Sequence, residues 1–224
     1  MCFNLLEVKL SNIVYDYIED YLRSIIPKSE GLMEDMEAFA RENNVPIVQP
    51  EVAKFLSFII KSNNAKNILE IGTAIGYSAI LMHNAAGSCR ILTIERNPDM
   101  YEKAEENIKM AKMDSDIKIL KGEADEILEK LDESFDLIFL DAAKGQYLQF
   151  FPECDRLLKK GGIIFADNVL FRGMVTNRKL LIRRKITIVK RLKKYIDFMM
   201  KNKNYETSIL PLGDGVSVSV KIGG

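Results

Sequence analysis

Three side chains with oxygen donors, Asp141, Asp167 and Asn168, directly follow two apolar runs of the sequence. Mg²⁺ takes such oxygens as ligands and keeps its other octahedral positions for water or substrate. No cysteine or histidine lies near these positions, which argues against zinc. Lys144, three residues after Asp141, could act as a general base or orient a substrate. The sequence therefore predicts a Mg²⁺ site beside a lysine; the alternative is a simple turn at residues 167–168 and a solvated loop lysine.

A second candidate site lies where an apolar run ends in Glu70-Ile-Gly72 and helix-forming residues resume at Tyr77. A strand that feeds a tight turn and a helix is where α/β proteins bind the nucleotide part of a ligand. The spacing is E-x-G-x-x-x-G, not the G-x-G-x-x-G of dinucleotide binders. Glu95 ends the next apolar run, roughly twenty residues on, where an acid commonly binds ribose hydroxyls. The pattern favours an adenosyl ligand over NAD.

Alternating strand and helix patterns must position these side chains. Strand-like runs occur at Asn67–Ile71, Arg90–Glu95, Ile117–Leu120, Asp136–Leu140 and Gly162–Ala166, and helical patterns at Ser78–Ala86, Pro98–Met113, Ala124–Leu131 and Gln146–Lys159. Such alternation predicts parallel strands joined by right-handed crossovers, with helices on both faces of the sheet. Ligands bind beyond the carboxyl ends of such strands, so we expect the candidate residues to meet at one edge.

The two ends of the chain complete the expected architecture. An N-terminal helical extension is expected over residues 1–62. It contains two helical patterns over residues 11–43, which Pro27 breaks and of which the second begins at Ser29. An extended linker at Val45–Pro50 and a helix at Glu51–Lys61 follow. A basic helix at about 179–201 precedes two strands, Tyr205–Leu210 and Val216–Ile222, which read as an antiparallel hairpin closing one sheet edge. We predict one doubly wound α/β domain over residues 1–224, with a mostly parallel seven-stranded sheet.

Composition is that of an ordinary globular protein, with 47% hydrophobic and 29% charged residues among 224. No apolar run approaches the length of a membrane span, and the N-terminus does not look like a signal peptide. Cys2, Cys89 and Cys154 form no C-x-x-C pair, so we expect reduced thiols and a cytoplasmic protein. His83 lies in a helical pattern away from the site and is expected to be a surface or packing residue.

Charge is distributed unevenly although the formal net charge is zero. Between Asn168 and Ile196 there is no acidic residue but there are ten basic ones. They are Arg172, Arg178, Lys179, Arg183, Arg184, Lys185, Lys190, Arg191, Lys193 and Lys194. Apolar residues at helical spacing (Ile182, Ile186, Val189, Leu192, Ile196 and Met199) predict a buried stripe on the same helix. The cations are interpreted as a surface for nucleic-acid phosphates; the alternative is a solvated helix face.

Taken together, these motifs resemble the metal-dependent class I O-methyltransferase family, which includes catechol and caffeoyl-CoA O-methyltransferases. The similarity spans about Met33 to Ile222. It rests on Ile47-Val-Gln-Pro-Glu51, Glu70-Ile-Gly-Thr-Ala-Ile-Gly-Tyr-Ser78, Ile94-Glu-Arg-Asn-Pro98, Asp141-Ala-Ala-Lys-Gly-Gln-Tyr147, Ala166-Asp-Asn-Val-Leu170 and Gly213-Asp-Gly215. Small-catechol enzymes of the family carry bulky aromatic residues near the metal, whereas here Ala142 and Ala143 follow Asp141 and tryptophan is absent.

The resemblance implies a Rossmann-like methyltransferase fold and a role for each candidate residue. It implies that Ile47, Glu70, Gly72 and Ser78 hold the methionine end of S-adenosylmethionine, that Glu95 binds the ribose hydroxyls and that Ala124 lies near the adenine. Tyr77 and Asp141 are implied to bind the cofactor as well. It implies further that Asp141, Asp167 and Asn168 bind Mg²⁺ or another divalent cation, and that the catalytic residues are Lys144, as base, and Asp141. The family resemblance also implies a homodimer.

Within the family, the segments Ala40–Glu51, Asn168–Gly173 and Arg183–Arg191 are similar to bacterial tRNA 5-hydroxyuridine methyltransferases. That similarity implies methylation of the 5-hydroxyl group of a wobble uridine in the anticodon loop of tRNA, giving 5-methoxyuridine. Phosphates of the tRNA would then face Arg172, Arg183, Arg184, Lys190, Arg191 and Lys194. Two alternatives stay open: the same chemistry on a small catechol-like or phenolic acceptor, and a non-catalytic RNA module that binds an adenosyl ligand.

Overall fold

A single seven-stranded sheet with the order β3-β2-β1-β4-β5-β7-β6 forms the centre of the protein. The computed structural model describes residues 13–142 and 144–223. The strands are β1 Asn67–Ile71, β2 Arg90–Glu95, β3 Ile117–Lys121, β4 Phe135–Leu140, β5 Leu158–Ala166, β6 Tyr205–Leu210 and β7 Val216–Lys221. The first five run parallel, and β7 pairs antiparallel with both β5 and β6. The predicted α/β class and the C-terminal hairpin at the sheet edge are confirmed.

The order of the strands reverses beside β1, and this reversal fixes where a ligand can bind. The chain runs outward from β1 to β2 and β3, then returns to lay β4 on the other side of β1. The loops after β1 and β4 therefore leave the sheet in opposite directions and open a crevice between them. Glu70-Ile-Gly72 ends β1 and Asp141 follows β4, so two of the predicted motifs lie on either side of this crevice.

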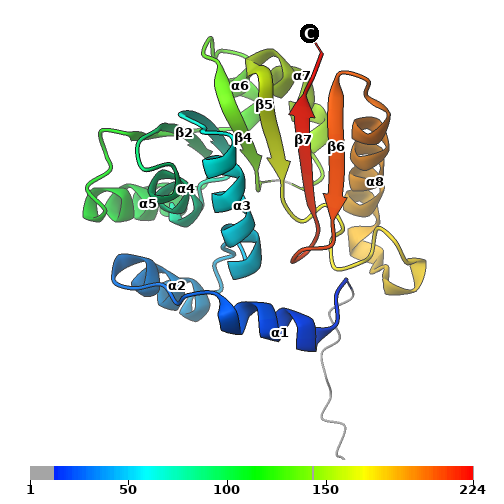
Figure 1. Ribbon diagram of the computed structural model, residues 1–224, viewed down its shortest axis with the longest axis horizontal. Helices are drawn as coiled ribbons and strands as arrows, with labels where there is room; N and C mark the ends of the chain where they lie inside the picture. The colour runs from blue at the N-terminus through cyan, green and yellow to red at the C-terminus, as the bar shows by residue number, and fades with distance from the viewer. Residues whose placement is uncertain (1–12, 143, 224) are drawn as a thin grey trace, which may run out of the picture.

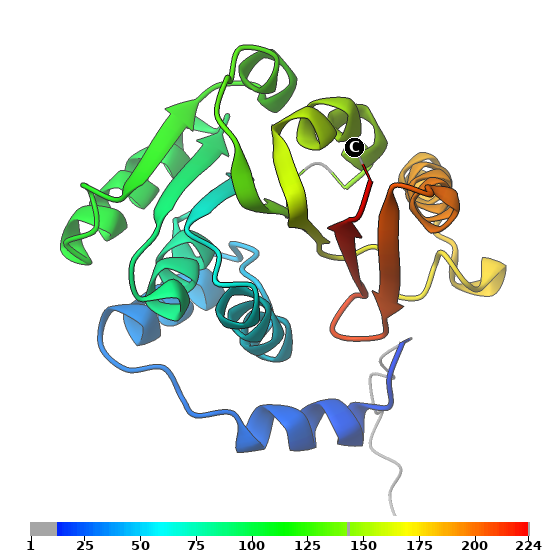
Figure 2. The same ribbon diagram turned by 45° about the horizontal axis from the view of Figure 1, so that its top comes forward.

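Helices cover both faces of the sheet, as Figures 1 and 2 show. One face carries α3 (Pro50–Ser62), α4 (Tyr77–Ala86) and α5 (Pro98–Met110), and the other carries α6 (Ala124–Leu128), α7 (Tyr147–Leu157) and α8 (Ile186–Lys201). The N-terminal helices α1 (Asp16–Ile25) and α2 (Leu32–Glu42) lie on the side where β5 ends. Side chains alternate along each strand, so Ile68 packs in one core layer while Leu69 packs in the other.

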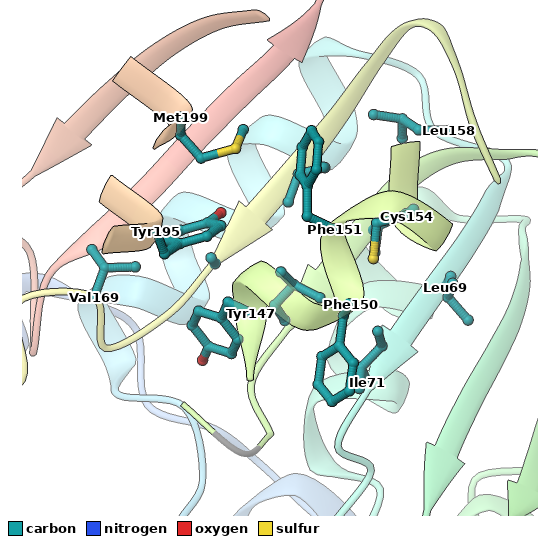
Figure 3. Packing of buried hydrophobic residues seen from close by; sticks show 14 of the residues in the cluster. Leu69, Ile71, Tyr147, Phe150, Phe151, Cys154, Leu158, Val169, Tyr195 and Met199 are labelled. Atoms are coloured by element: carbon teal, nitrogen blue, oxygen red, sulfur yellow. The ribbon is translucent and has the colours of Figure 1, made fainter. Parts of the chain in front are cut away.

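The core layer under α7 and α8 is aromatic, and it reaches the candidate site. Figure 3 shows Tyr147, Tyr195 and Phe151 in this layer. The rings of Tyr147 and Tyr195 meet edge to face with centroids 5.5 Å apart. The buried Tyr147 hydroxyl donates a hydrogen bond to the main-chain carbonyl of Asp167 over 2.9 Å. Core packing on this face therefore fixes the end of β5 from which Asp167 projects.

The predicted basic helix is wrong in its first part. Helix α8 begins at Ile186 instead of 179, and two single 3₁₀ turns, Arg178–Leu180 and Arg183–Lys185, precede it. Ile182 is 46% exposed and does not belong to the buried stripe, in which Tyr195 lies instead. A helix from 179 would have placed several cations in its first turns, where the helix dipole disfavours positive charge. The basic segment therefore consists of an irregular stretch, residues 178–185, which we call the strap, followed by helix α8.

Smaller differences also have local causes. Helix α2 begins at Leu32 instead of Ser29, because Gly31 adopts a left-handed conformation with φ +58°. Helix α3 begins one residue early, with Pro50 at its first position. Cys89 and Cys154 are buried free thiols, and Cys2 lies outside the described residues. Among the helices that the structure describes, none has the length and apolar character needed to cross a membrane.

Asp136 joins the beginnings of three central strands, and its loss should destabilise the fold. Its Oδ2 accepts the main-chain N–H groups of Lys66 and Asn67 at 2.9 and 2.8 Å, and its Oδ1 accepts from Lys159 Nζ at 2.7 Å. Partial burial alone would raise the pKa of Asp136, but these donors outweigh it and hold the pKa below its ordinary value. We expect Asp136→Ala to lower the free energy of unfolding by about 1–3 kcal/mol at pH 7.

The pH dependence of this loss follows from the sign of the shift. A carboxylate with a lowered folded pKa stabilises the fold above its unfolded pKa of about 3.9, and this contribution is lost as the pH falls through the folded value. Urea unfolding should therefore separate wild type and Asp136→Ala at pH 7 and bring them together in strong acid. Asp132→Ala, which removes an exposed carboxylate nearby, serves as the control. Equal midpoints for all three proteins at pH 7 would contradict the assignment.

Candidate active site

A cleft of about 350 Å³ lies beyond the carboxyl ends of the parallel strands and gathers most of the residues predicted to hold the cofactor, the metal and the acceptor proton. Residues from the ends of β1, β2, β4 and β5, from the N-terminal linker and from the β6–β7 turn line it. They include Ile47, Gln49, Gly72, Glu95, Asp141, Lys144, Asp167, Asn168, Arg172 and Asp214. Gln49 and Asp214 were not among the sequence candidates, although Asp214 stands in the Gly213-Asp-Gly215 motif. These candidate residues meet at one edge of the sheet, as predicted.

A smaller pocket continues this cleft toward α6 and α7. Gly72, Glu95 and Ala142 line both spaces, so the two join at the ends of β1 and β2. The smaller pocket is further lined by Ile71, Ile94, Arg96, Gly122, Glu123, Ala124, Asp125, Gln146 and Phe150. Apolar side chains such as Ile71, Ile94 and Phe150 suit a flat ring, and charged side chains lie in both spaces. An elongated ligand that carries a flat ring at one end matches this pair of spaces.

The turn after β1 is shaped by glycine. Gly72 has φ +108°, and a Cβ atom there would lie 2.8 Å from Ala142 Cβ, too close for any side chain. The N–H groups of Gly72 and Thr73 donate to the carbonyl of Ile94 over 3.1 and 3.2 Å. The turn is thereby held against β2 while its backbone faces the loop after β4. Only a bare backbone fits at this narrowest point of the cleft.

Glu70 lies beneath the floor of the cleft and is fully buried. The Thr93 hydroxyl donates to its Oε2 over 2.6 Å, and the Ser78 hydroxyl faces the same carboxylate. Burial raises the pKa of Glu70 to about 7, against the opposing effect of these hydroxyls. Its Oε1 has no hydrogen-bond partner among the residues described. A buried acceptor left in this state is stabilised by a ligand that brings a donor, preferably a cationic one.

Glu95 is held in place at the end of β2 by the main chain around it. Its Oε2 accepts the N–H of Ala74 at 2.9 Å, and its Oε1 accepts the N–H of Asn97 at 2.8 Å. The carboxylate is therefore oriented before any ligand arrives, at the point where the two spaces join. Each oxygen keeps a free lone pair, as a diol ligand such as ribose requires.

Asp141 and Asp167 form a pair of like charges removed from water. Desolvation raises the pKa of Asp141, with Lys144 opposing this and Glu70 adding to it. Desolvation also raises the pKa of Asp167, and the charge of Asp141 raises it further. Two such carboxylates are stable in ionised form only beside a cation. Asn168, at φ +58°, follows Asp167 and lines the same cleft.

This donor set fits a hard divalent cation. No group of three or more His, Cys, Asp or Glu side chains in the described ranges is arranged to hold a metal. The candidate set is instead two carboxylates and one amide, which leaves octahedral positions for water and substrate as Mg²⁺ prefers. Asp167 Oδ1 accepts the N–H of Asn168 over 2.6 Å, which fixes the direction of its carboxylate. Oxygen donors of this type and number are compatible with Mg²⁺.

Phe171 connects the candidate base to the basic strap, a role that the sequence did not suggest. Its ring centroid lies 5.9 Å from Lys144 Nζ and 5.8 Å from Lys185 Nζ. Phe171 and Arg172 both have left-handed backbones, at φ +47° and +54°. The N–H groups of Leu170 and Phe171 both donate to the carbonyl of Asp214, which holds this strained loop in place. The β6–β7 turn therefore sets the position of the ring beside Lys144.

Several predicted residues lie apart from this cleft. The Tyr77 hydroxyl donates to Glu37 Oε1 over 2.7 Å and faces a separate cavity between the N-terminal helices, so only its main chain is near the glycine turn. Arg183, Arg184 and Lys190 are exposed outside the cleft. Arg191 and Lys194 line a different, shallow cleft beside Gly145. Of the predicted phosphate ligands, Arg172 alone lines the cleft.

Comparisons with known proteins agree on one family. The family model for O-methyltransferases matches residues 25–222. A catechol O-methyltransferase from Niastella koreensis is 34% identical over 173 residues, covering 74% of this chain and 78% of its own length. Among solved structures, a candidate caffeoyl-CoA O-methyltransferase from Staphylococcus aureus has a TM-score of 0.86 at 35% identity, with 92% of this chain and all of that chain covered.

A further solved structure similar to this chain contains a bound ligand. An O-methyltransferase from Bacillus cereus, in complex with S-adenosylhomocysteine (SAH), has a TM-score of 0.79 and 25% identity. The superposition covers 92% of this chain and 97% of that chain.

The close approach of Gly72 to Ala142 provides a test of the cleft. We expect Gly72→Ala to weaken the binding of SAH by about tenfold or more, because the new methyl group must displace the Ala142 loop. Gly87→Ala is the matched control, since Gly87 also has a left-handed backbone, φ +70°, with no atom within 4 Å of its would-be Cβ. Both variants should lose stability from strain, but calorimetric SAH titration should separate them. Equal SAH affinities would contradict this account of the cleft.

Proposed function

This chain belongs to the O-methyltransferase family, and we propose that it transfers a methyl group from S-adenosylmethionine to the 5-hydroxyl group of wobble 5-hydroxyuridine in tRNA. The family makes it an O-methyltransferase of the catechol and caffeoyl-CoA type. The RNA acceptor is the finer step. The observation that carries it is the run of ten basic and no acidic residues that begins on the wall of the cleft, at Arg172.

The joined spaces suit S-adenosylmethionine in one orientation. The pocket with Ala124 and Phe150 would take the adenine, and the Glu95 carboxylate would take the two ribose hydroxyls. The bare backbone at Gly72 would leave room for the chain of the cofactor to pass. Its methionine end would then lie near Ile47 and above Glu70, whose unpaired Oε1 is suited to a positively charged ammonium group.

Transfer from sulfonium to oxygen is an in-line displacement, so the protein must mainly position the acceptor and remove its proton. Asp141, Asp167 and Asn168 would hold the divalent cation. When bound, such a cation supplies positive charge that neutralises the carboxylate pair and lowers the pKa of a coordinated hydroxyl group. In its unprotonated form, Lys144 Nζ would accept the proton of that hydroxyl, and Phe171 would keep the amine over the cleft.

The acceptor is supported by chemistry inside the cleft and by charge outside it. In 5-hydroxyuridine the 5-oxygen is adjacent to the 4-carbonyl oxygen, an arrangement that chelates a metal as a catechol does. Ala142, beside the carboxylates, leaves the space that larger side chains would fill. Exposed cations on the strap and on α8 would attract phosphates in a sequence-independent way, while the cleft reads the splayed base. The anticodon loop offers both features.

A small catechol-like or phenolic acceptor is the second candidate, and the similarity to the Niastella koreensis catechol O-methyltransferase favours it. The same donors would serve, with the strap cations facing an anionic substrate tail. The two candidate functions differ in whether the phosphates of an RNA contribute to binding of the acceptor. The expected cytoplasmic location and homodimer stay predictions that fractionation and light scattering would check.

Mass spectrometry of tRNA nucleosides tests the acceptor. Cells that lack the gene should lose 5-methoxyuridine and accumulate 5-hydroxyuridine, and the purified protein should methylate that tRNA in vitro. The in vitro arm should run beside catechol at equal concentration. Unchanged 5-methoxyuridine in the deletion strain, with efficient turnover of catechol, would replace the first candidate by the second.

The carboxylate pair should be needed for turnover but not for cofactor binding. We expect Asp167→Ala to lower kcat by at least about a thousandfold, as loss of a metal ligand commonly does for metal-assisted chemistry, while the Kd for SAH changes little. EDTA should likewise abolish wild-type turnover, and added Mg²⁺ should restore it. Asp197→Ala, an exposed acid on α8, is the control. Full activity of the wild type in EDTA would refute the metal requirement.

A further inference from the structure

A second, shallow cleft of about 340 Å³ lies beside the acceptor site. Gly145, Leu148 and Gln149, from the loop after Lys144 and the first turn of α7, form one side, and Arg191 and Lys194 of α8 form the other. Gly145 is the residue next to Lys144 in the chain. The loop that carries Lys144 into the larger cleft therefore also lines the second cleft, through Gly145.

Helix α8 and the Lys144 loop are packed tightly at this point. A Cβ atom on Gly145 would lie 3.3 Å from Arg191 Cδ and 3.9 Å from the Cα of Ile188. Glycine therefore lets the Arg191 side chain cross directly over the loop, with its guanidinium nitrogen Nη1 3.7 Å from the same Cβ position. The charge of Arg191 is thus placed beside the backbone that carries the candidate base.

The electrostatics of this cleft favour an anion. None of the residues that line it is acidic. Neither Arg191 nor Lys194 forms an ion pair with a carboxylate in the described part of the chain, although Asp197 is only three residues from Lys194. Gln149 is the polar neighbour, and its amide makes one long bond of 3.4 Å to Asp125. The guanidinium group of Arg191 offers a rigid fork of hydrogen-bond donors, and Lys194 offers a mobile ammonium group. Both face one open space, and together they match a phosphate group.

We propose that this cleft binds a phosphate group of the acceptor, next to the nucleotide that is methylated. The inference rests on the proposed function and adds a defined subsite to it. An RNA phosphodiester next to the target nucleotide would reach the cleft while the base enters beside Lys144. Binding there would orient the target base as well as add affinity, whereas Arg183 and Arg184 on the strap face phosphates further away.

The test is a charge-matched pair of double variants. Arg191→Gln with Lys194→Gln should raise KM for an anticodon stem–loop containing 5-hydroxyuridine by about tenfold or more, and lower the slope of log KM against log salt by about two. Lys201→Gln with Lys203→Gln removes the same charge from two exposed positions at and just beyond the end of α8, outside the run of ten basic residues, and is the control. The ratio of kcat/KM for the stem–loop to that for the 5-hydroxyuridine nucleoside should fall in the first pair only.

The outcomes separate the subsite from the proposed function. Equal losses in both double variants, or an equal loss on the nucleoside, would overturn the subsite while leaving the RNA acceptor in place. If the stem–loop is not methylated at all, the same double variants are assayed with caffeoyl-CoA, an acceptor that carries phosphates, and with a free catechol, an acceptor that carries none. A selective loss on caffeoyl-CoA would support the subsite with a diphosphate as its ligand. Unchanged KM for both acceptors would overturn it.

Discussion

The arrangement of this protein depends on negative charge held away from water at the ends of adjacent parallel strands. Glu70, Asp141 and Asp167 lie in a row in which each charge raises the pKa of the next. Burial of such charges costs several kcal/mol per ion unless a cation offsets it. Lys144 is the cation placed beside them. Cationic ligands would relieve this repulsion, so ligand binding and fold stability are coupled in this protein.

The charges stay in place because three separate parts of the chain support the cleft. Tyr147, in the aromatic core layer, bonds the carbonyl of Asp167 from one side of the sheet. The β6–β7 turn holds the Phe171 loop and also approaches the N-terminal linker, where a Cβ on Gly213 would lie 2.8 Å from Gln49 Oε1. Gln49 Oε1 in turn accepts a hydrogen bond from Arg23 of α1 at 3.1 Å. Helix, hairpin and linker thus meet around a single opening.

The sequence predicted local features well, and it failed where distant segments decide. β1, β2 and β6 match the predicted ranges because an apolar run bounded by polar residues leaves few choices. The basic helix was placed too early because apolar spacing alone says nothing about the helix dipole. Tyr77 was assigned to the cofactor, yet its hydroxyl turns to Glu37 on a helix some forty residues earlier in the chain, a contact that no local pattern reveals. The β6–β7 turn holds Phe171 in position. The sequence could therefore indicate Lys144 as a candidate base, but it could not predict that the Phe171 ring lies beside Lys144.

Two kinds of structural element line the cleft. The side that faces the donor consists of strand ends and the glycine turn, which the sheet itself makes rigid. The acceptor side consists of the N-terminal linker, the strained loop after β5 and the β6–β7 turn, none of which belongs to the sheet. Evolution could therefore exchange one acceptor for another by rebuilding these outer segments, while the sheet and its methyl donor stay the same. Descendants of one ancestor could in this way come to modify a free phenol, a phenol carried on a coenzyme A thioester or an RNA base without a new catalytic centre.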